Sequence, residues 1–176
     1  MNKEFTISVY TENFAGLLNQ ITIIFNRRKV NIESLTVSES EVKGIHRFTI
    51  VVVAEKDQVE RIVKQIEKVV EVFRAFVHET DEIIHQEIAL YKVPTKSLSN
   101  GKDLEKMIRD NNARILTVEP DFMVIEKTGH KSETQALYEA LSEYGILQFV
   151  RSGRVSVSRP IMALSAYLRE LDEAYD

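Results

Sequence analysis

The sequence predicts an α+β fold in which the order β-α-β-β-α-β occurs twice and is followed by a C-terminal helix. Runs that alternate apolar and polar residues, such as residues 5–10, are typical of half-buried strands. Runs with apolar residues at helical spacing, such as residues 17–25, are typical of amphipathic helices. Because strands and helices follow in the same order in both halves, we expect two tandem ferredoxin-like domains of the split β-α-β type.

The first half supplies four strands and two helices. Asn13 is the expected N-cap of the first helix, because it precedes an apolar-periodic run. Asp57 and Glu60, three residues apart, resemble a capping box for the second helix. A nearly continuous apolar run suggests that the third strand is central in its sheet. The expected strands are residues 5–10, 31–39, 45–54 and 70–78, and the expected helices are residues 15–28 and 57–66.

The second half repeats this order after a short polar linker at residues 80–82. Ser132 and Gln135 suggest a further capping box, and Gly145 stands where a glycine ends a helix. Beyond Pro160, apolar residues at helical spacing predict an amphipathic C-terminal helix over residues 160–176. We therefore expect domains at residues 1–80 and 81–159. The strands expected in this half are residues 83–93, 113–118, 122–127 and 146–150, with helices at residues 102–111 and about 132–144.

Composition excludes several classes of protein. The 176 residues carry 23 basic and 27 acidic side chains, so a general nucleic-acid binder, which needs a basic excess, is disfavoured. Cysteine is absent, which removes disulfides and thiolate metal sites. The N-terminus lacks the apolar core of a signal peptide, and no apolar run is long enough to span a bilayer. We expect a cytoplasmic protein without a membrane-spanning segment.

The turn before the first helix is the best candidate for a binding site. Gly16 falls in the first helical turn, where glycine disfavours helix formation but allows a close approach to the backbone. A helix N-terminus presents unpaired N–H groups and suits a carboxylate. Asn13 and Asn31 lie at opposite ends of the strand–helix–strand unit, so only a side-by-side dimer would bring them together. An amide side chain can bind an amino or a carboxyl group.

No enzyme motif stands out. A phosphate-binding glycine loop and a nucleophile elbow are both missing, and the four histidines show no metal-ligand spacing. The basic, hydroxyl-rich stretch from Arg151 to Arg159 leaves two interpretations open: a site for a phosphate or an acidic partner, or a solvated strand end. Arg27 and Arg28 either dock on an acidic partner or are ordinary charges at a helix C-terminus, and we favour the second reading.

Several runs resemble the regulatory small subunit of acetolactate synthase, also called acetohydroxyacid synthase, with its N-terminal ACT ligand-sensing domain. They begin with residues 12–18 (Glu-Asn-Phe-Ala-Gly-Leu-Leu) and residues 25–37, and the most specific part is residues 31–37 (Asn-Ile-Glu-Ser-Leu-Thr-Val). Residues 65–72, 87–93 and 151–155 also have counterparts, so the resemblance extends to about Arg159. One departure is Phe14, which stands at a turn position where the family has a small or polar residue, and where it would either narrow the pocket or face away from it.

The resemblance implies a non-catalytic subunit of branched-chain amino acid biosynthesis. Such a subunit binds the catalytic (large) subunit, activates it and conveys feedback inhibition by L-valine. The family places thiamine diphosphate, FAD and Mg²⁺ in the catalytic chain, so no cofactor is expected here. The effector is held between the ACT domains of a homodimer. By this resemblance the valine-binding residues are Asn13, Gly16, Leu17, Leu18, Asn31 and Ile32.

Two other classes of function remain as alternatives. The first is a free-standing amino-acid-binding ACT regulator, or a transcription regulator in which the ligand domain drives a DNA-binding part. The acidic chain has no helix-turn-helix segment, which disfavours it. A small metabolic enzyme built from tandem ferredoxin-like domains would need a cluster of perturbed catalytic groups in a pocket. Turnover of an acyl substrate by the purified chain alone would favour this last reading.

Overall fold

The computed structural model describes residues 1–159 together with Ala166, Arg169 and Glu173. The expected C-terminal helix over residues 160–176 therefore lies outside the described residues. The chain divides into two compact units, the first formed by residues 1–84 with the segment that begins at Arg154, and the second by residues 85–153. Each unit has the α+β architecture that the sequence predicts.

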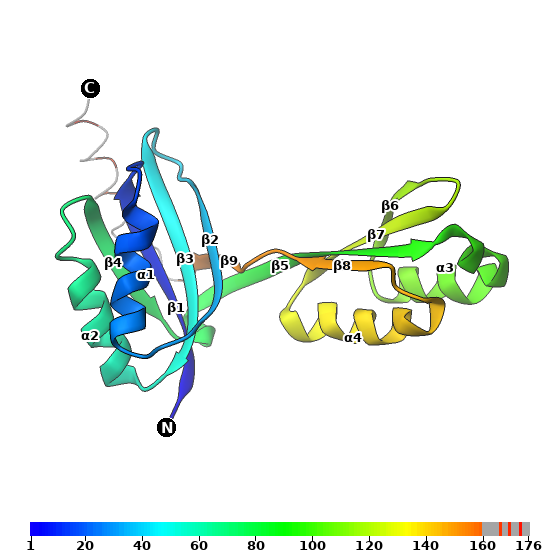
Figure 1. Ribbon diagram of the computed structural model, residues 1–176, viewed down its shortest axis with the longest axis horizontal. Helices are drawn as coiled ribbons and strands as arrows, with labels where there is room; N and C mark the ends of the chain where they lie inside the picture. The colour runs from blue at the N-terminus through cyan, green and yellow to red at the C-terminus, as the bar shows by residue number, and fades with distance from the viewer. Residues whose placement is uncertain (160–165, 167–168, 170–172, 174–176) are drawn as a thin grey trace. The chain divides into compact units, whose positions relative to one another are not determined.

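The first unit is a four-stranded antiparallel sheet in the order β2-β3-β1-β4. Inner strand β3 carries the near-continuous apolar run expected of a central strand, whereas β1, the other inner strand, alternates apolar residues with polar ones. The connections β1–α1–β2 and β3–α2–β4 place α1 and α2 on the same face of the sheet (Figure 1). The elements are β1 (Lys3–Glu12), α1 (Leu17–Arg27), β2 (Ile32–Glu39), β3 (Ile45–Ala54), α2 (Lys56–Ile66) and β4 (Val72–His78).

The core of this unit lies between the sheet and its two helices. Alternate residues of β1 face the helices and are almost fully buried, for example Ile7 and Val9 at 0% exposure. From α1, the residues Leu17, Ile21 and Phe25 pack into the same cluster at the expected helical spacing. Leu18, which the periodicity also placed on this face, is instead 45% exposed.

The helix ends differ from the sequence predictions. Gly16, and not Asn13, is the N-cap of α1, which begins at Leu17. For α2 the N-cap is Glu55, without a side-chain hydrogen bond, so the predicted box of Asp57 with Glu60 is wrong. Asp57 lies instead in the first turn, where its charge suits the helix dipole.

The second unit repeats the strand order of the first, as β6-β7-β5-β8. A capping box does precede α4, but it joins His130 to Glu133 and not Ser132 to Gln135. Gly145 has φ 80° and ends the 3-10 turn after α4, as predicted. Its core includes Tyr91, Leu104 and Ile125. The elements are β5 (Ile83–Pro94), α3 (Gly101–Asp110), β6 (Arg114–Val118), β7 (Phe122–Gly129), α4 (Lys131–Leu141) and β8 (Gln148–Arg151), with short 3-10 turns at Thr80–Glu82, Thr95–Asn100 and Ser142–Tyr144.

The last described strand, β9 (Val155–Ser158), belongs to the first unit. The Arg159 N–H donates to the Glu82 carbonyl at 2.8 Å, next to the start of β5. The backbone of Arg154 bonds the side chains of two residues of β2: its N–H donates to Ser34 Oγ at 3.2 Å, and its carbonyl accepts from Thr36 Oγ1 at 2.9 Å. The chain thus returns to the first unit after completing the second.

Candidate functional site

The turn between β1 and α1 is organised by Gly16. Its φ of 89° lies in the left-handed region, where an L side chain is strained. A Cβ built at Gly16 would meet nothing within 4 Å, so the space beside the turn is open. No side chain caps the helix that begins here. The turn therefore requires glycine for its backbone and leaves the helix N-terminus uncovered.

The first backbone N–H groups of α1 precede its hydrogen-bond ladder. The first i→i−4 bond runs from the Gln20 N–H to the Gly16 carbonyl at 3.1 Å, and the Leu17 N–H reaches the Phe14 carbonyl at 3.3 Å. The N–H groups of Leu18 and Asn19 lie between these two bonds, in the part of the helix where intrahelical acceptors are lacking. An anion is the natural ligand for such groups.

Asn13 lies beside this turn but does not cap it. Because Gly16 takes the N-cap position, Asn13 stands three residues further out, and its exposed side chain is free of a capping role. It lines a pocket of about 330 Å³ on the described surface. The other residues of that pocket are Glu12, Lys43, Gly44, Ile45 and Phe73.

The three residues predicted to form an apolar ligand wall differ in exposure, as does Phe14 in the turn. Leu17 is 1% exposed and belongs to the core, so its side chain cannot form a ligand wall. Leu18 is 45% exposed, and Ile32 is partly buried at the start of β2. Phe14 is 52% exposed, so it does not fill the turn from within its own chain.

Within one chain, the structure does not bring Asn31 and Ile32 to Asn13 and Gly16. Strands β1 and β2 both pair antiparallel with β3, with Glu12 opposite Ile45 and Ile32 opposite Val52. Those two positions of β3 are separated by about 23 Å, at about 3.3 Å per residue. The predicted residues therefore form two clusters at opposite ends of the sheet.

Arg151 and Arg154, in the stretch with two open interpretations, both have partners within the chain. Arg151 Nε lies 2.9 Å from Glu87 Oε1 in the second unit. Arg154 Nη2 lies 2.8 Å from Glu4 Oε1 in the first unit, and its Nη1 donates to Thr6 Oγ1 at 2.8 Å. Neither guanidinium is a solvated strand end, and neither is left free for a phosphate.

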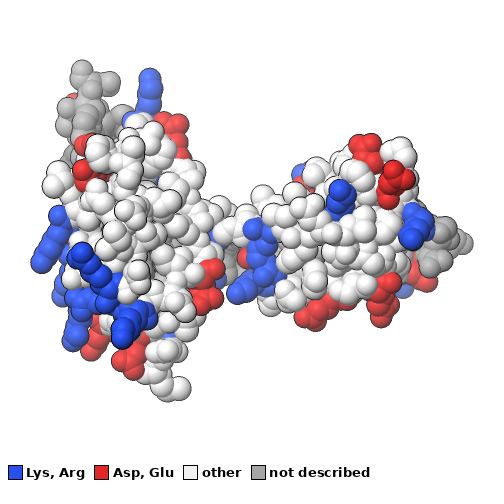
Figure 2. Space-filling model, viewed as in Figure 1, with Lys and Arg blue, Asp and Glu red and all other residues white. Residues whose placement is uncertain are grey.

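Arg28, at the end of α1, also makes contacts within the chain. Its carbonyl accepts from Gln58 Nε2 at 2.9 Å and its Nε donates to Gln65 Oε1 at 3.3 Å, which ties α1 to α2. Figure 2 shows basic side chains gathered over this helical part of the first unit. These bonds support the structural reading of Arg28, while Arg27 remains exposed.

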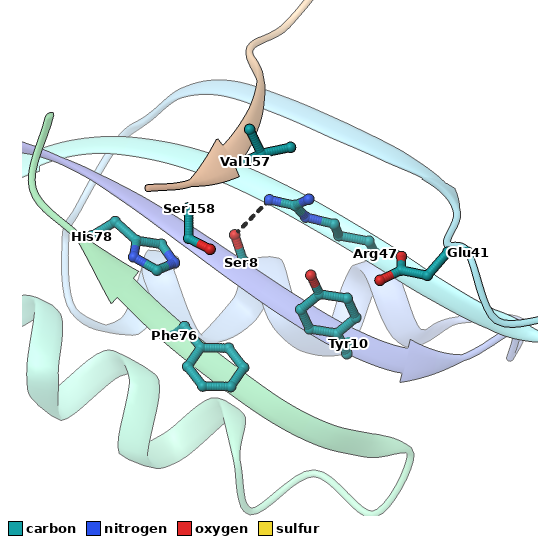
Figure 3. Close-up of a pocket in the computed structure, with 8 residues that line it drawn as sticks. All are labelled: Ser8, Tyr10, Glu41, Arg47, Phe76, His78, Val157 and Ser158. Carbon is teal, nitrogen blue, oxygen red and sulfur yellow. Dashed lines mark hydrogen bonds between the residues drawn. The ribbon is translucent and has the colours of Figure 1, made fainter. Parts of the chain in front are cut away.

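A second site, which sequence reasoning missed, lies on the face of the first sheet opposite the helices. The register places Ser8, Tyr10 and Arg47 on this face. Tyr10 and Arg47 are directly opposite each other, and Ser8 lies two residues before Tyr10 on the same strand. Strand β9 contributes Val157 and Ser158, and together these residues line a pocket of about 140 Å³ (Figure 3). The remaining lining residues are Glu41, Phe76 and His78.

The sequence shows the polar alternation on this face but not its burial. Strand β1 carries Thr6, Ser8 and Tyr10 in alternation, and all three are at most 3% exposed. A sheet face with solvated polar residues would leave them accessible. Buried hydroxyls on the second face indicate that another segment covers it, but the identity of that segment could not be read from the pattern.

Neither metal binding nor membrane insertion is indicated by the described residues. Within residues 1–159 and the three described positions beyond, no three His, Asp or Glu side chains converge as metal ligands. In the same part of the chain, none of the helices has the length and apolarity needed to cross a bilayer.

Comparisons with known proteins agree with this architecture. Residues 7–74 match the family model described as the AHAS small subunit-like ACT domain, and residues 86–160 match the model of the small subunit of acetolactate synthase. The acetolactate synthase small subunit of Mycobacterium leprae is 36% identical over 154 residues, covering 88% of this chain and 90% of the relative. That of Bacillus subtilis is 34% identical, covering 87% and 89%.

A solved structure extends the likeness to three dimensions. The acetolactate synthase small subunit from Thermotoga maritima superposes with a TM-score of 0.82 at 28% identity, covering 91% of this chain and 99% of that one. Fold and matches together define a protein with an N-terminal ACT domain and a second ferredoxin-like domain. The chain belongs to the acetolactate synthase small-subunit family. Its role is that of a regulatory subunit in branched-chain amino acid synthesis.

Proposed function

We propose that this chain activates the catalytic (large) subunit of acetolactate synthase in the cytoplasm and makes it sensitive to feedback inhibition by L-valine. The chain would perform no catalysis itself. Thiamine diphosphate, FAD and Mg²⁺ would all be bound by the catalytic subunit. The family to which the chain belongs supports pairing with a catalytic partner.

The observation that carries the valine site is the conformation of Gly16. A left-handed N-cap without a side chain leaves the first N–H groups of α1 open, and a carboxylate is their natural ligand. In this proposal the valine carboxylate binds near Gly16, Leu17 and Leu18. Because the Leu17 side chain is buried, that residue would contribute through its backbone, and Leu18 would contribute an apolar wall.

A homodimer would complete the site. Strand β2 is at the edge of the first sheet, and a two-fold pairing of two β2 edges would be antiparallel. Since β1 and β2 run in the same direction, such pairing puts the start of the partner's β2 at the end where β1 finishes. Asn31 and Ile32 of the partner subunit would then face Asn13 and Gly16, although about 23 Å separates the two clusters in one chain.

Regulation would follow from differential binding. Valine must bind the inhibited assembly more tightly than the active one, and linkage requires that the catalytic state changes valine affinity by the same factor. Such couplings are typically about 1–3 kcal/mol. An apolar wall discriminates one methylene by about 1–3 kcal/mol, so valine would be preferred over leucine or isoleucine without strict exclusion.

The test is calorimetric titration of the chain with L-valine, with D-valine as the control, followed by activity assays with the catalytic subunit. We expect Gly16→Asp to abolish valine inhibition while it spares activation, because it places a negative charge where the carboxylate binds. Gly16→Ala is a control that introduces the backbone strain without the charge. Gly145→Asp is a second control that introduces both the strain and the charge at another left-handed glycine, in the second unit. Full valine inhibition in Gly16→Asp would remove this site assignment.

A further inference from the structure

Arg47 is a partly buried cation that forms no ion pair among the described residues. Its Nη2 donates to Ser8 Oγ at 3.1 Å and to Ser156 Oγ at 3.3 Å, both neutral hydroxyls. Its Nε is buried and has no hydrogen-bond partner in the part of the chain that the structure describes. No described carboxylate lies within 4.0 Å of this guanidinium. Buried charges in proteins are normally paired, so Arg47 indicates a missing anion.

The surroundings of Arg47 offer neutral donors and apolar walls. The hydroxyls of Ser8 and Ser156 accept from the guanidinium, which leaves their own O–H groups available as donors. The Tyr10 ring lies 5.7 Å from Arg47 Cζ and 6.3 Å from the ring of Phe76. Burial raises the pKa of Tyr10, so its phenol stays protonated and can donate. The rings of Tyr10 and Phe76 supply contacts for a short hydrocarbon group (Figure 3).

The charges at the rim select the type of anion. Glu41 lines the pocket and is exposed, so it would repel a dianion more strongly than a monoanion. The volume of about 140 Å³ is well above the roughly 10–15 Å³ that a single water needs. One guanidinium, neutral hydroxyls and apolar walls match a small organic monocarboxylate better than inorganic phosphate, which favours several cations.

We propose that the pocket between β9 and the open face of the first sheet binds a small organic monocarboxylate, with Arg47 as its anchor. This site is separate from the valine site proposed at Gly16 and does not depend on it, because the two share no residue. Its carboxylate would meet the unpaired edge of the guanidinium and the hydroxyls of Ser8 and Ser156. The hydrocarbon group would lie against Tyr10 and Phe76.

The test is a titration of the full chain, labelled with ¹⁵N-arginine, followed through the Nε–H resonance of Arg47. Propionate is the probe, inorganic phosphate is the competing anion, and chloride keeps the ionic strength constant. We expect a saturable shift with propionate and none with phosphate. In Ser158→Phe, which places a bulky ring at the pocket wall and keeps Arg47, we expect the apparent affinity to fall by about tenfold or more.

Two further variants locate the binding by backbone amide shifts. Arg47→Gln should abolish saturable propionate shifts at the residues of the pocket. Arg74→Gln is the matched control, because Arg74 also contacts Phe76, with Cζ 5.8 Å from its ring, but does not line the pocket. It should bind propionate as the wild type does. The proposal is overturned if propionate fails to saturate the wild type, if phosphate alone saturates it, or if Arg47→Gln and Ser158→Phe both retain wild-type affinity.

Discussion

Arg154 and Glu4 form an ion pair on the open face of the first sheet, with 2.8 Å between Nη2 and Oε1. The Arg154 side chain is 11% exposed, and the same guanidinium donates to Thr6 Oγ1. Its backbone N–H donates to Ser34 Oγ on β2. One residue of the segment before β9 is therefore bonded to both β1 and β2, on the face that the helices leave uncovered.

Replacing Arg154 should destabilise the first unit. In Arg154→Leu, Glu4 and Thr6 lose a largely shielded charged partner, and we expect the free energy of unfolding to fall by about 1–3 kcal/mol. Urea denaturation followed by circular dichroism measures this loss. Arg114→Leu is the control, because its pair with Glu126, at 2.6 Å, involves a side chain that is 70% exposed. The control should lose less than about 1 kcal/mol, and equal losses would contradict the role given to Arg154.

The pair of Glu87 and Arg151 should show strong energetic coupling in the second unit. Glu87 is 9% exposed and also accepts from Thr134 Oγ1 at 2.5 Å. Removing one partner leaves a buried charge, so Glu87→Ala should cost about 3–5 kcal/mol. The double variant with Arg151→Ala should lose less than the sum of the single losses, by about 0.5–3 kcal/mol. Additive losses in a denaturant double-mutant cycle would show that the two charges act independently.

His78 should make the first unit less stable in acid. Burial lowers its pKa below the ordinary 6.5, Glu82 partly offsets this, and Arg47 adds to it. The unfolded chain therefore takes up the proton first, and the stability contributed by neutral His78 is complete above about pH 6.5 and declines as the pH falls. Unfolding at about pH 8 and about pH 5.5 should show a larger loss in the wild type than in His78→Gln. An identical pH dependence in both would contradict this assignment.

Asn31→Ala should weaken valine binding without unfolding the domain. The Asn31 side chain is exposed, so its truncation removes no core contact. Loss of one hydrogen bond to the ligand costs about 0.5–1.5 kcal/mol, which is about a two- to twelvefold rise in Kd by titration calorimetry. Asn26→Ala, at an exposed asparagine near the end of α1, is the control and should titrate as the wild type. Unchanged affinity in Asn31→Ala would exclude Asn31 from the site.

The order of elements and the core were predictable because they depend on local periodicity. Alternation in β1 and helical spacing in α1 placed Ile7, Val9, Ile21 and Phe25 in the core, where the structure has them. Helix ends were less predictable. Asn13 is a good N-cap by residue type, but the backbone at Gly16 turns left-handed and takes that position. The box at α4 uses His130, a residue type outside the usual capping set.

The contacts of Arg154 and Arg47 were beyond prediction from local patterns. Arg154 meets partners 118 to 150 positions away in sequence, and Arg47 meets Ser156 across 109 positions. Spacing rules describe neighbours within one helix or one strand pair, and they carry no information about which distant segment covers an open sheet face. The basic stretch from Arg151 to Arg159 can be recognised in the sequence, whereas the partners of its arginines follow from the tertiary structure alone.

The return of β9 makes the first unit discontinuous in sequence, with the second unit, His85–Gly153, inserted between Ile84 and Arg154. During synthesis from the N-terminus, residues 1–84 emerge well before Arg154 and Ser156, so the hydroxyl-bearing face of their sheet waits uncovered. The second unit, which is continuous from His85 to Gly153, can finish its own core first. The last native contacts of the N-terminal domain therefore form late, and a chain that ends at Gly153 would contain the whole second unit but lack the segment that completes the first.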